Sequence, residues 1–91
     1  MPYNQLGSTI LQEIIKNSEK KDKNAQLGKV MRFIRLKNSL TQKQMANILQ
    51  MPYQNYQRYE YGIYKPKPER LGKFCDIFRI EQALLVKEFY I

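Results

Sequence analysis

The residues best suited to recognition chemistry lie close together at positions 53–61, in the sequence YQNYQRYEY. Glutamine and arginine, here Gln54 and Arg58, form paired hydrogen bonds with the major-groove edges of adenine and guanine, respectively. Helical spacing divides this segment into an outward face and a core face. The outward face holds Tyr53, Gln54, Gln57, Arg58 and Tyr61, and the core face holds Tyr56, Tyr59 and Glu60. The segment therefore predicts a short helix, 52–61, whose exposed side reads base pairs of duplex DNA.

A second short helix is predicted directly before this one. Thr41 and Gln44 have the spacing of a capping box, in which each side chain caps the other's backbone amide. Met51 precedes Pro52, and a residue before proline is pushed out of the helical region, so the helix must stop there. Ala46 is small enough to permit a close crossing. Two helices joined by so tight a turn are typical of a helix-turn-helix unit, which places its second helix in the major groove of DNA.

The rest of the chain predicts further helices and no strand. Apolar residues at i, i+3, i+4 and i+7 predict a helix over 25–37, with Leu27, Val30, Met31 and Ile34 facing the core. The inner face of the helix that Thr41 opens is expected to be Met45, Ile48 and Leu49. Gly62 is expected to cap helix 52–61 in the left-handed conformation. Pro68 and Glu69 open a helix with Leu71, Phe74, Cys75 and Phe78 inward, and a last helix over 81–89 buries Leu84 and Leu85.

The N-terminal part of the chain has a different pattern of apolar and charged residues. An apolar stripe predicts an extra helix over 8–16, and the charged stretch 17–24 (NSEKKDKN) has no periodicity and is expected to be a linker. The predicted fold is therefore all-α: a compact bundle of five short helices plus an extra N-terminal helix. We expect residues 1–26 to form this helix and linker, and residues 27–91 to form the DNA-binding domain with its C-terminal helix.

The charge of the chain favours a polyanionic partner. Its 16 Lys and Arg residues against 8 Asp and Glu give a net charge of +8. Between Lys29 and Lys67 there are eight basic residues and one acid, Glu60. The basic surplus thus coincides with the predicted DNA-binding segment, which favours nucleic acid over an anionic membrane. The alternative is that these lysines merely keep the protein in solution.

Other features argue against catalysis and against membranes. The chain has no histidine, the commonest general base and metal ligand, and its four glycines are isolated, so no phosphate-binding loop is present. We therefore expect no enzymatic activity, no cofactor and no metal. A single cysteine fits a reducing compartment. No apolar run reaches membrane-spanning length and no signal peptide is recognised, so a cytoplasmic location is expected.

From about Leu27 to Leu85 the chain resembles the Cro/repressor-type helix-turn-helix domains of phage and plasmid regulators. The resemblance is carried by an ordered set of residues with the correct gaps. These are Leu40–Gln42, Met45–Ala46, Glu60 two residues before Gly62, Pro66, Leu71, Phe74–Cys75, Phe78 and Ile80. The resemblance implies a lambda-repressor-like fold and a palindromic DNA operator that is read by a homodimer.

The resemblance also implies roles for individual residues. Base readout falls to Tyr53, Gln54, Gln57 and Arg58. Phosphate contacts fall to Gln42, Lys43, Asn55, Tyr61, Lys65 and Lys67. Arg35 and Glu60 match a paired arginine and glutamate that tie the first domain helix to the reader helix.

The chain departs from the family pattern at three positions. Gln50 stands where the turn usually has glycine, and a positive φ there would cost about 1–2 kcal/mol. Pro52 replaces the usual Ser or Thr cap, and Arg79 also stands where glycine is common. These departures concern fine geometry and leave the expected fold unchanged.

Simpler roles are open for several of these residues. Arg58 and Tyr53 could be ordinary surface residues, and Gln42 a plain residue of the capping region. Cys75 is expected to be a small core residue rather than a redox sensor. The helical spacing of the tyrosines disfavours a stacking platform for single-stranded nucleic acid.

The sequence therefore predicts a sequence-specific double-stranded DNA-binding protein, in particular a transcriptional repressor. The alternative is the antitoxin of a toxin–antitoxin module, which binds a toxin protein and represses its own operon. It is motivated by the predicted helix 8–16 and by the apolar C-terminal sequence VKEFYI, either of which could dock a partner. A non-binding scaffold is disfavoured by the predicted outward face of helix 52–61.

Overall fold

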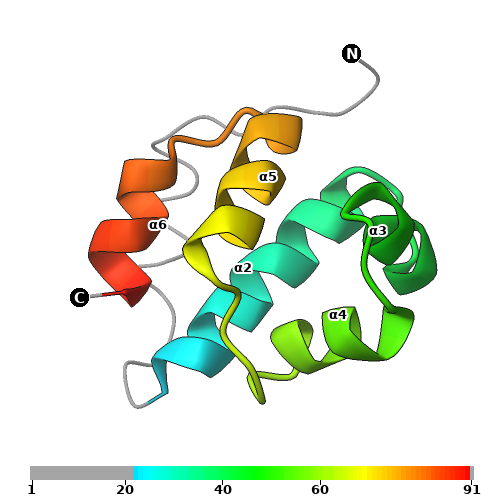
Figure 1. The fold of residues 1–91 in the computed structure, drawn as a ribbon, viewed down its shortest axis with the longest axis horizontal. Coiled ribbons are helices and arrows are strands. Elements are labelled where there is room, and N and C mark those ends of the chain that lie inside the picture. The colour runs from blue at the N-terminus through cyan, green and yellow to red at the C-terminus, as the bar shows by residue number, and fades with distance from the viewer. Residues whose placement is uncertain (1–21, 91) are drawn as a thin grey trace.

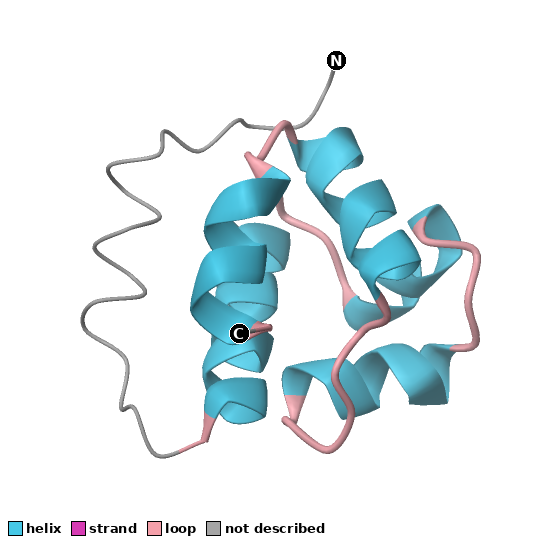
Figure 2. Ribbon diagram, turned by 60° about the vertical axis from the view of Figure 1, so that its left-hand side comes forward, coloured by secondary structure: helices cyan, strands magenta, loops and turns pink. Residues whose placement is uncertain are grey.

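The computed structural model describes residues 22–90, and these residues fold into five helices (Figure 1). The helices are α2 (Lys23–Lys37), α3 (Gln42–Ile48), α4 (Tyr53–Glu60), α5 (Pro68–Phe78) and α6 (Gln82–Phe89). All regular structure in this range is helical (Figure 2), which confirms the predicted all-α fold. The extra helix predicted over 8–16 lies outside the described residues.

Helix α2 is the central element of the arrangement. It packs against α4 on one side and α6 on the other, while α3 packs against α4 and α5 against α6 (Figure 1). One apolar core joins all five helices. Its largest fully buried side chains are Leu27, Met31, Ile34, Met45, Leu49, Tyr56, Leu71, Phe74, Phe78, Leu85 and Phe89. The expected inward stripes of α2 and α5 are thereby confirmed. Ile48 and Leu84, which were also expected to be inward, are only half-buried, and Leu84 packs against the edge of the core.

Helix α2 begins earlier than the sequence pattern predicted. It starts at Lys23 rather than Ala25, inside the stretch expected to be a linker. The reason is Asp22, whose carboxylate accepts hydrogen bonds from the backbone amides of Asn24 and Ala25 and so satisfies two donors that the first turn leaves free. Gln26, placed by prediction in the N-terminal part, is buried within the domain.

A close approach of two backbones fixes how α2 crosses α4. A Cβ atom at Gly28 would lie 2.4 Å from the carbonyl oxygen of Glu60 and 2.6 Å from that of Tyr59. Only a residue without a Cβ atom lets the backbones of α2 and α4 come this close. Gly28 therefore lets the C-terminal end of α4 lie directly on α2.

Candidate nucleic-acid interface

The start of α3 is fixed by the predicted capping box. Thr41 Oγ1 accepts from the Gln44 backbone amide at 3.0 Å, and Gln44 Oε1 accepts from the Thr41 amide at 2.8 Å. These two bonds satisfy donors that the first turn of a helix leaves free. The capping box thereby sets the position of Gln42, the first residue of α3.

The turn between α3 and α4 is strained at Gln50. This residue has φ of 56°, the left-handed conformation that glycine adopts without penalty. Two cations of α5 hold the turn: Arg70 Nη1 donates to the Leu49 carbonyl at 2.8 Å, and Lys73 Nζ donates to Gln50 Oε1. Pro52 has an extended backbone with ψ of 141°, so α4 begins at Tyr53, one residue later than predicted.

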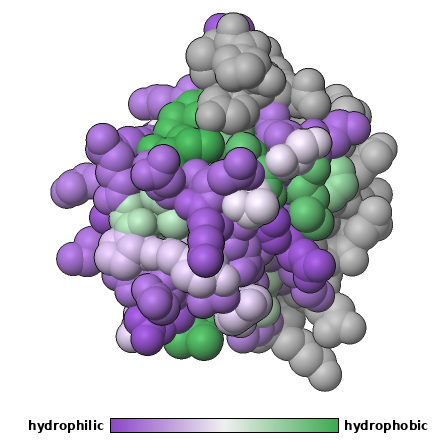
Figure 3. Space-filling model, turned by 90° about the vertical axis from the view of Figure 1, so that its right-hand side faces the viewer, coloured by the Kyte–Doolittle hydropathy of each residue, from purple (hydrophilic) through white to green (hydrophobic). Residues whose placement is uncertain are grey.

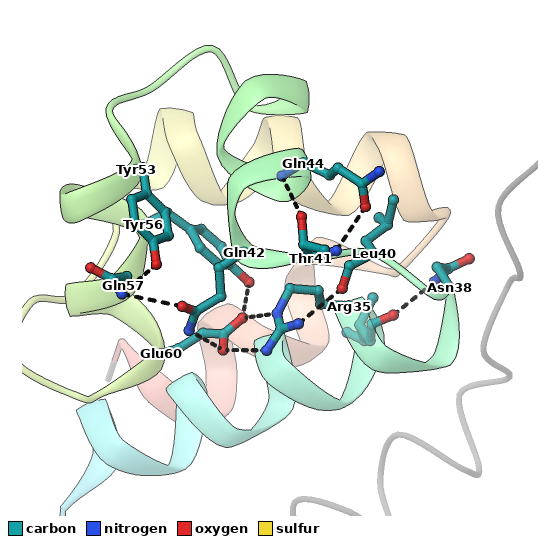
Figure 4. A network of polar contacts seen from close by, with 11 residues as sticks. Arg35, Asn38, Leu40, Thr41, Gln42, Gln44, Tyr53, Tyr56, Gln57 and Glu60 are labelled. Atoms are coloured by element: carbon teal, nitrogen blue, oxygen red, sulfur yellow. Dashed lines mark hydrogen bonds and ion pairs between the residues drawn. The ribbon is translucent and has the colours of Figure 1, made fainter.

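The carboxylate of Glu60 is the point where three helices meet (Figure 4). Arg35 of α2 donates to it from Nε at 2.6 Å and from Nη2 at 3.1 Å, and Gln42 of α3 donates from Nε2 at 3.1 Å. The Tyr56 hydroxyl, one turn earlier on α4, donates to Oε2. Arg35 also donates from Nη1 to the Leu40 carbonyl at 2.9 Å, which ties the segment before α3 to the same cluster.

This cluster shifts the ionisation of its members in the direction that stabilises the pair. Hydrogen bonding to Glu60 raises the pKa of the Arg35 guanidinium. Burial, and secondarily the bond to Glu60, raises the pKa of Tyr56. Removing one partner of a buried ion pair leaves an uncompensated charge and costs about 3–5 kcal/mol. The pair of Arg35 and Glu60 therefore holds α4 on α2 with an interaction that is costly to break.

Of the predicted base readers, Gln54 and Arg58 project fully from α4 and are exposed. Arg58 Nη1 donates to Asn55 Oδ1 at 3.1 Å, and the Arg58 guanidinium carbon lies 5.5 Å from the centre of the Tyr64 ring. Contact with Asn55 on one side and Tyr64 on the other limits the conformations of the arginine. The surface over α3 and α4 is mostly hydrophilic, with scattered apolar residues (Figure 3).

Tyr53 and Gln57 differ from the other two because both are half-buried. The Tyr53 ring packs against the edge of the core, and Lys43 Nζ lies 5.4 Å from its centre. Gln57 Nε2 donates to the Tyr53 hydroxyl at 2.8 Å and to Gln42 Oε1 at 3.3 Å. The two residues thus belong both to the outward face and to the polar network below it.

The residues predicted to contact phosphate are spread over α3, α4 and the following loop. Lys43, Tyr61 and Lys67 are exposed, and Gln42 and Asn55 are partly buried. Lys65 is exposed but engaged at the end of α6, where its Nζ lies 3.5 Å from the Phe89 carbonyl oxygen and 4.6 Å from the centre of the Tyr90 ring.

Sequence reasoning missed a groove beside α4. It is open to solvent and about 630 Å³ in volume, and it lies between α4, the following loop and the start of α5. Its walls are Tyr59, Ile63, Tyr64, Lys65, Lys67, Glu69, Arg70 and Lys73. Arg70 and Lys73 were not predicted as site residues. Their i, i+3 spacing in the first turns after Pro68 was the available signal.

The described residues show no site for catalysis by a metal. Within 22–90, no group of three or more histidine, cysteine, aspartate or glutamate residues is arranged to hold a metal ion. Cys75 is buried, and burial raises the pKa of its thiol to about 12, which keeps it in the unreactive thiol form. No helix of this part of the chain is long and apolar enough to cross a bilayer.

A family model described as helix-turn-helix matches residues 31–81, more than half of the chain. The chain belongs to the helix-turn-helix family of the Cro/C1 type. The matched residues include α3, α4 and α5 entirely and part of α2. This is a family of DNA-binding domains of transcription regulators and is typically not enzymatic, so DNA is a partner of this helix-turn-helix protein. Neither the curated proteins nor the solved structures gave a match.

Proposed function

We propose that this helix-turn-helix protein is a sequence-specific transcriptional repressor that binds a palindromic operator as a homodimer. Each protomer places α4 in the major groove, and two copies reach successive grooves about 34 Å apart on one face of the duplex. Repression follows when the bound dimer covers a promoter. The observation that carries the proposal is the exposed pair Gln54 and Arg58 on a helix whose inner side is anchored by buried Glu60.

The polar and charged side chains on and around α4 divide into two roles in this proposal. Arg58 reads a guanine, since its guanidinium presents two parallel donors, and Gln54 reads an adenine. Polar and charged groups around α4, exposed or partly buried, bind phosphates, and these contacts set register and overall strength without selecting sequence. The proposed phosphate contacts are Gln42, Lys43, Asn55, Tyr61, Lys65 and Lys67.

The test is selection of bound duplexes from a random pool by the purified full-length chain, followed by titration of variants. A palindromic consensus is expected. Arg58→Ala is expected to relax the preference at one base pair, by about 1–3 kcal/mol, while retaining most non-specific affinity. Lys43→Ala is expected to weaken binding to all duplexes about equally and to lower the salt dependence.

The matched control for these charge changes is Lys87→Ala, since Lys87 is exposed on α6, away from α3 and α4 (Figure 1). This variant is expected to bind the consensus with nearly unchanged preference. If Arg58→Ala leaves affinity and base preference as they were, the assignment of base readout is wrong. If the chain ignores every duplex even at low salt, the whole proposal is wrong.

The antitoxin alternative receives no support from the described residues. Phe89 is buried in the core, and the Tyr90 hydroxyl donates to the Pro66 carbonyl. The apolar C-terminal residues thus pack on their own domain as far as residue 90. The predicted helix 8–16, the other motive for this alternative, lies outside the described residues. Co-purification with a small toxic enzyme would favour it.

A further inference from the structure

A row of hydrogen bonds joins the buried carboxylate of Glu60 to the hydroxyl group of half-buried Tyr53 (Figure 4). Glu60 receives four donors on its two oxygens, one each from Tyr56 and Gln42 and two from Arg35. Two carboxylate oxygens offer about four acceptor sites, so the group is saturated. It can only accept, and it therefore fixes the direction of the whole row.

Two glutamine side chains continue the row from Glu60 to Tyr53, and the orientation of each is fixed by the one before it. Because Glu60 only accepts, Gln42 must turn its Nε2 toward it, which leaves Gln42 Oε1 facing Gln57. Gln57 must then donate through Nε2 to that oxygen, since the opposite orientation would place two amide oxygens together. The same Nε2 lies 2.8 Å from the Tyr53 hydroxyl oxygen and supplies its second hydrogen there.

The orientation of the two glutamines determines how the Tyr53 hydroxyl can bond. A phenolic hydroxyl has one hydrogen to donate, and its oxygen here already accepts from Gln57. The structure shows no acceptor for that hydrogen among the described residues. The ring itself is fixed, because it packs on the core edge below Lys43 Nζ. Tyr53 thus presents a donor of fixed direction to whatever lies against α4.

We propose that Tyr53 is a dedicated hydrogen-bond donor to the major-groove edge of DNA, and that Gln57 is a positioning residue that makes it so. This inference rests on the proposed function above. Guanine, adenine and thymine each offer an acceptor on that edge, whereas cytosine offers only an amino donor. Tyr53 therefore rejects cytosine at one position of each half-site, and Gln57 acts through Tyr53 rather than on a base.

The experiment compares base preferences of three variants in the same selection, using full-length protein. Tyr53→Phe keeps the ring and removes the hydroxyl, so discrimination against cytosine is expected to fall about 2- to 10-fold at one position. Gln57→Met removes the orienting amide and is expected to relax the same position. Gln57→Glu turns the partner into an acceptor that takes the Tyr53 proton, so preference there is expected to move toward bases that present an amino group, cytosine and adenine.

The added charge of Gln57→Glu lowers affinity for all duplexes alike, so the readout is base preference and not affinity. Gln82→Met on α6 controls for replacement of a glutamine and is expected to keep the wild-type preference. A merely structural role for Gln57 would lower stability or affinity without moving the preference at the position that Tyr53→Phe affects.

Three results would overturn the inference. One is an equal loss of affinity on every sequence in Tyr53→Phe, which would make the acceptor a backbone phosphate. Another is an unchanged preference in Tyr53→Phe despite a clear wild-type consensus, which would leave the proposed function standing. The third is a wild-type preference for cytosine at the affected position. If the wild-type chain selects no consensus at all, the proposed function itself fails.

Discussion

Replacing Gly28 by alanine tests whether the contact between α2 and α4 is as close as the structure shows. In an exposed helix the change would stabilise by about 0.8–1.0 kcal/mol, because alanine is the better helix former. At Gly28 the new Cβ atom would lie 2.4 Å from the Glu60 carbonyl oxygen, about 1 Å inside ordinary contact at 3.4 Å. The atoms that it meets belong to the backbone of α4, so no side-chain rotation relieves the overlap.

The two helices must then move apart, which also strains the bonds between Arg35 and Glu60. Overpacking of this kind costs about 1–3 kcal/mol. The packing cost outweighs the gain in helix propensity, and Gly28→Ala is expected to lower the free energy of unfolding. Urea unfolding followed by circular dichroism measures it.

Gly72→Ala on α5 is the matched control. A Cβ atom there would meet the side-chain oxygen of Gln82 at 3.2 Å and its amide nitrogen at 3.4 Å, atoms at the free end of a flexible side chain. This variant is expected to gain up to about 1 kcal/mol from helix propensity. The reasoning is refuted if Gly28→Ala stabilises the protein as much as Gly72→Ala does.

Two further predictions concern the turn and the core. Gln50→Gly is expected to raise the free energy of unfolding by up to about 1 kcal/mol, because relief of the left-handed strain exceeds both the entropy that glycine adds to the unfolded chain and the loss of the exposed bond from Lys73. A lower stability than wild type in the same urea titration would contradict this. Burial raises the pKa of the Cys75 thiol from 9.0 to about 12. The contribution of the buried, protonated thiol to the free energy of unfolding is therefore complete below pH 9 and is lost as the pH rises toward 12. Cys75→Val removes that contribution, so the decrease of the free energy of unfolding with pH between pH 9 and 12 is expected to become less steep by up to about 1.4 kcal/mol per pH unit. An unchanged slope would show that Cys75 does not contribute.

The sequence was most informative where the signal is local. The capping box of Thr41 and Gln44 depends on a spacing of three residues, and both of its bonds are present. The apolar stripe of α2 and the proline at the start of α5 likewise act within one or two turns of helix. The left-handed conformation of Gly62 followed from its place just after helix 52–61, whereas that of Gln50 was suggested only by the resemblance, in which glycine is usual at this turn position.

Prediction was weaker where a neighbour distant in sequence decides. The cap at Asp22 is an exception: it depends on amides only two and three residues further on, and it was missed because the stretch around it is charged and has no periodicity. Helical spacing placed Tyr53 and Gln57 on the outward face, but the packing of α4 against α3 leaves both half-buried and bonded to each other. The groove formed with Arg70 and Lys73 joins residues of separate elements, which no local pattern links.

The sequence by itself determined the set of helices, the helix-turn-helix motif and the residue types displayed on α4, because each of these follows from periodicity, caps and turns within a few neighbours. Only the tertiary structure decided which of those side chains are free and which are held. In a row of hydrogen bonds, the group that can only accept decides which way every other member donates, and here that group is Glu60. The row exists only because folding brings residues 35, 42, 53, 57 and 60 together from three helices.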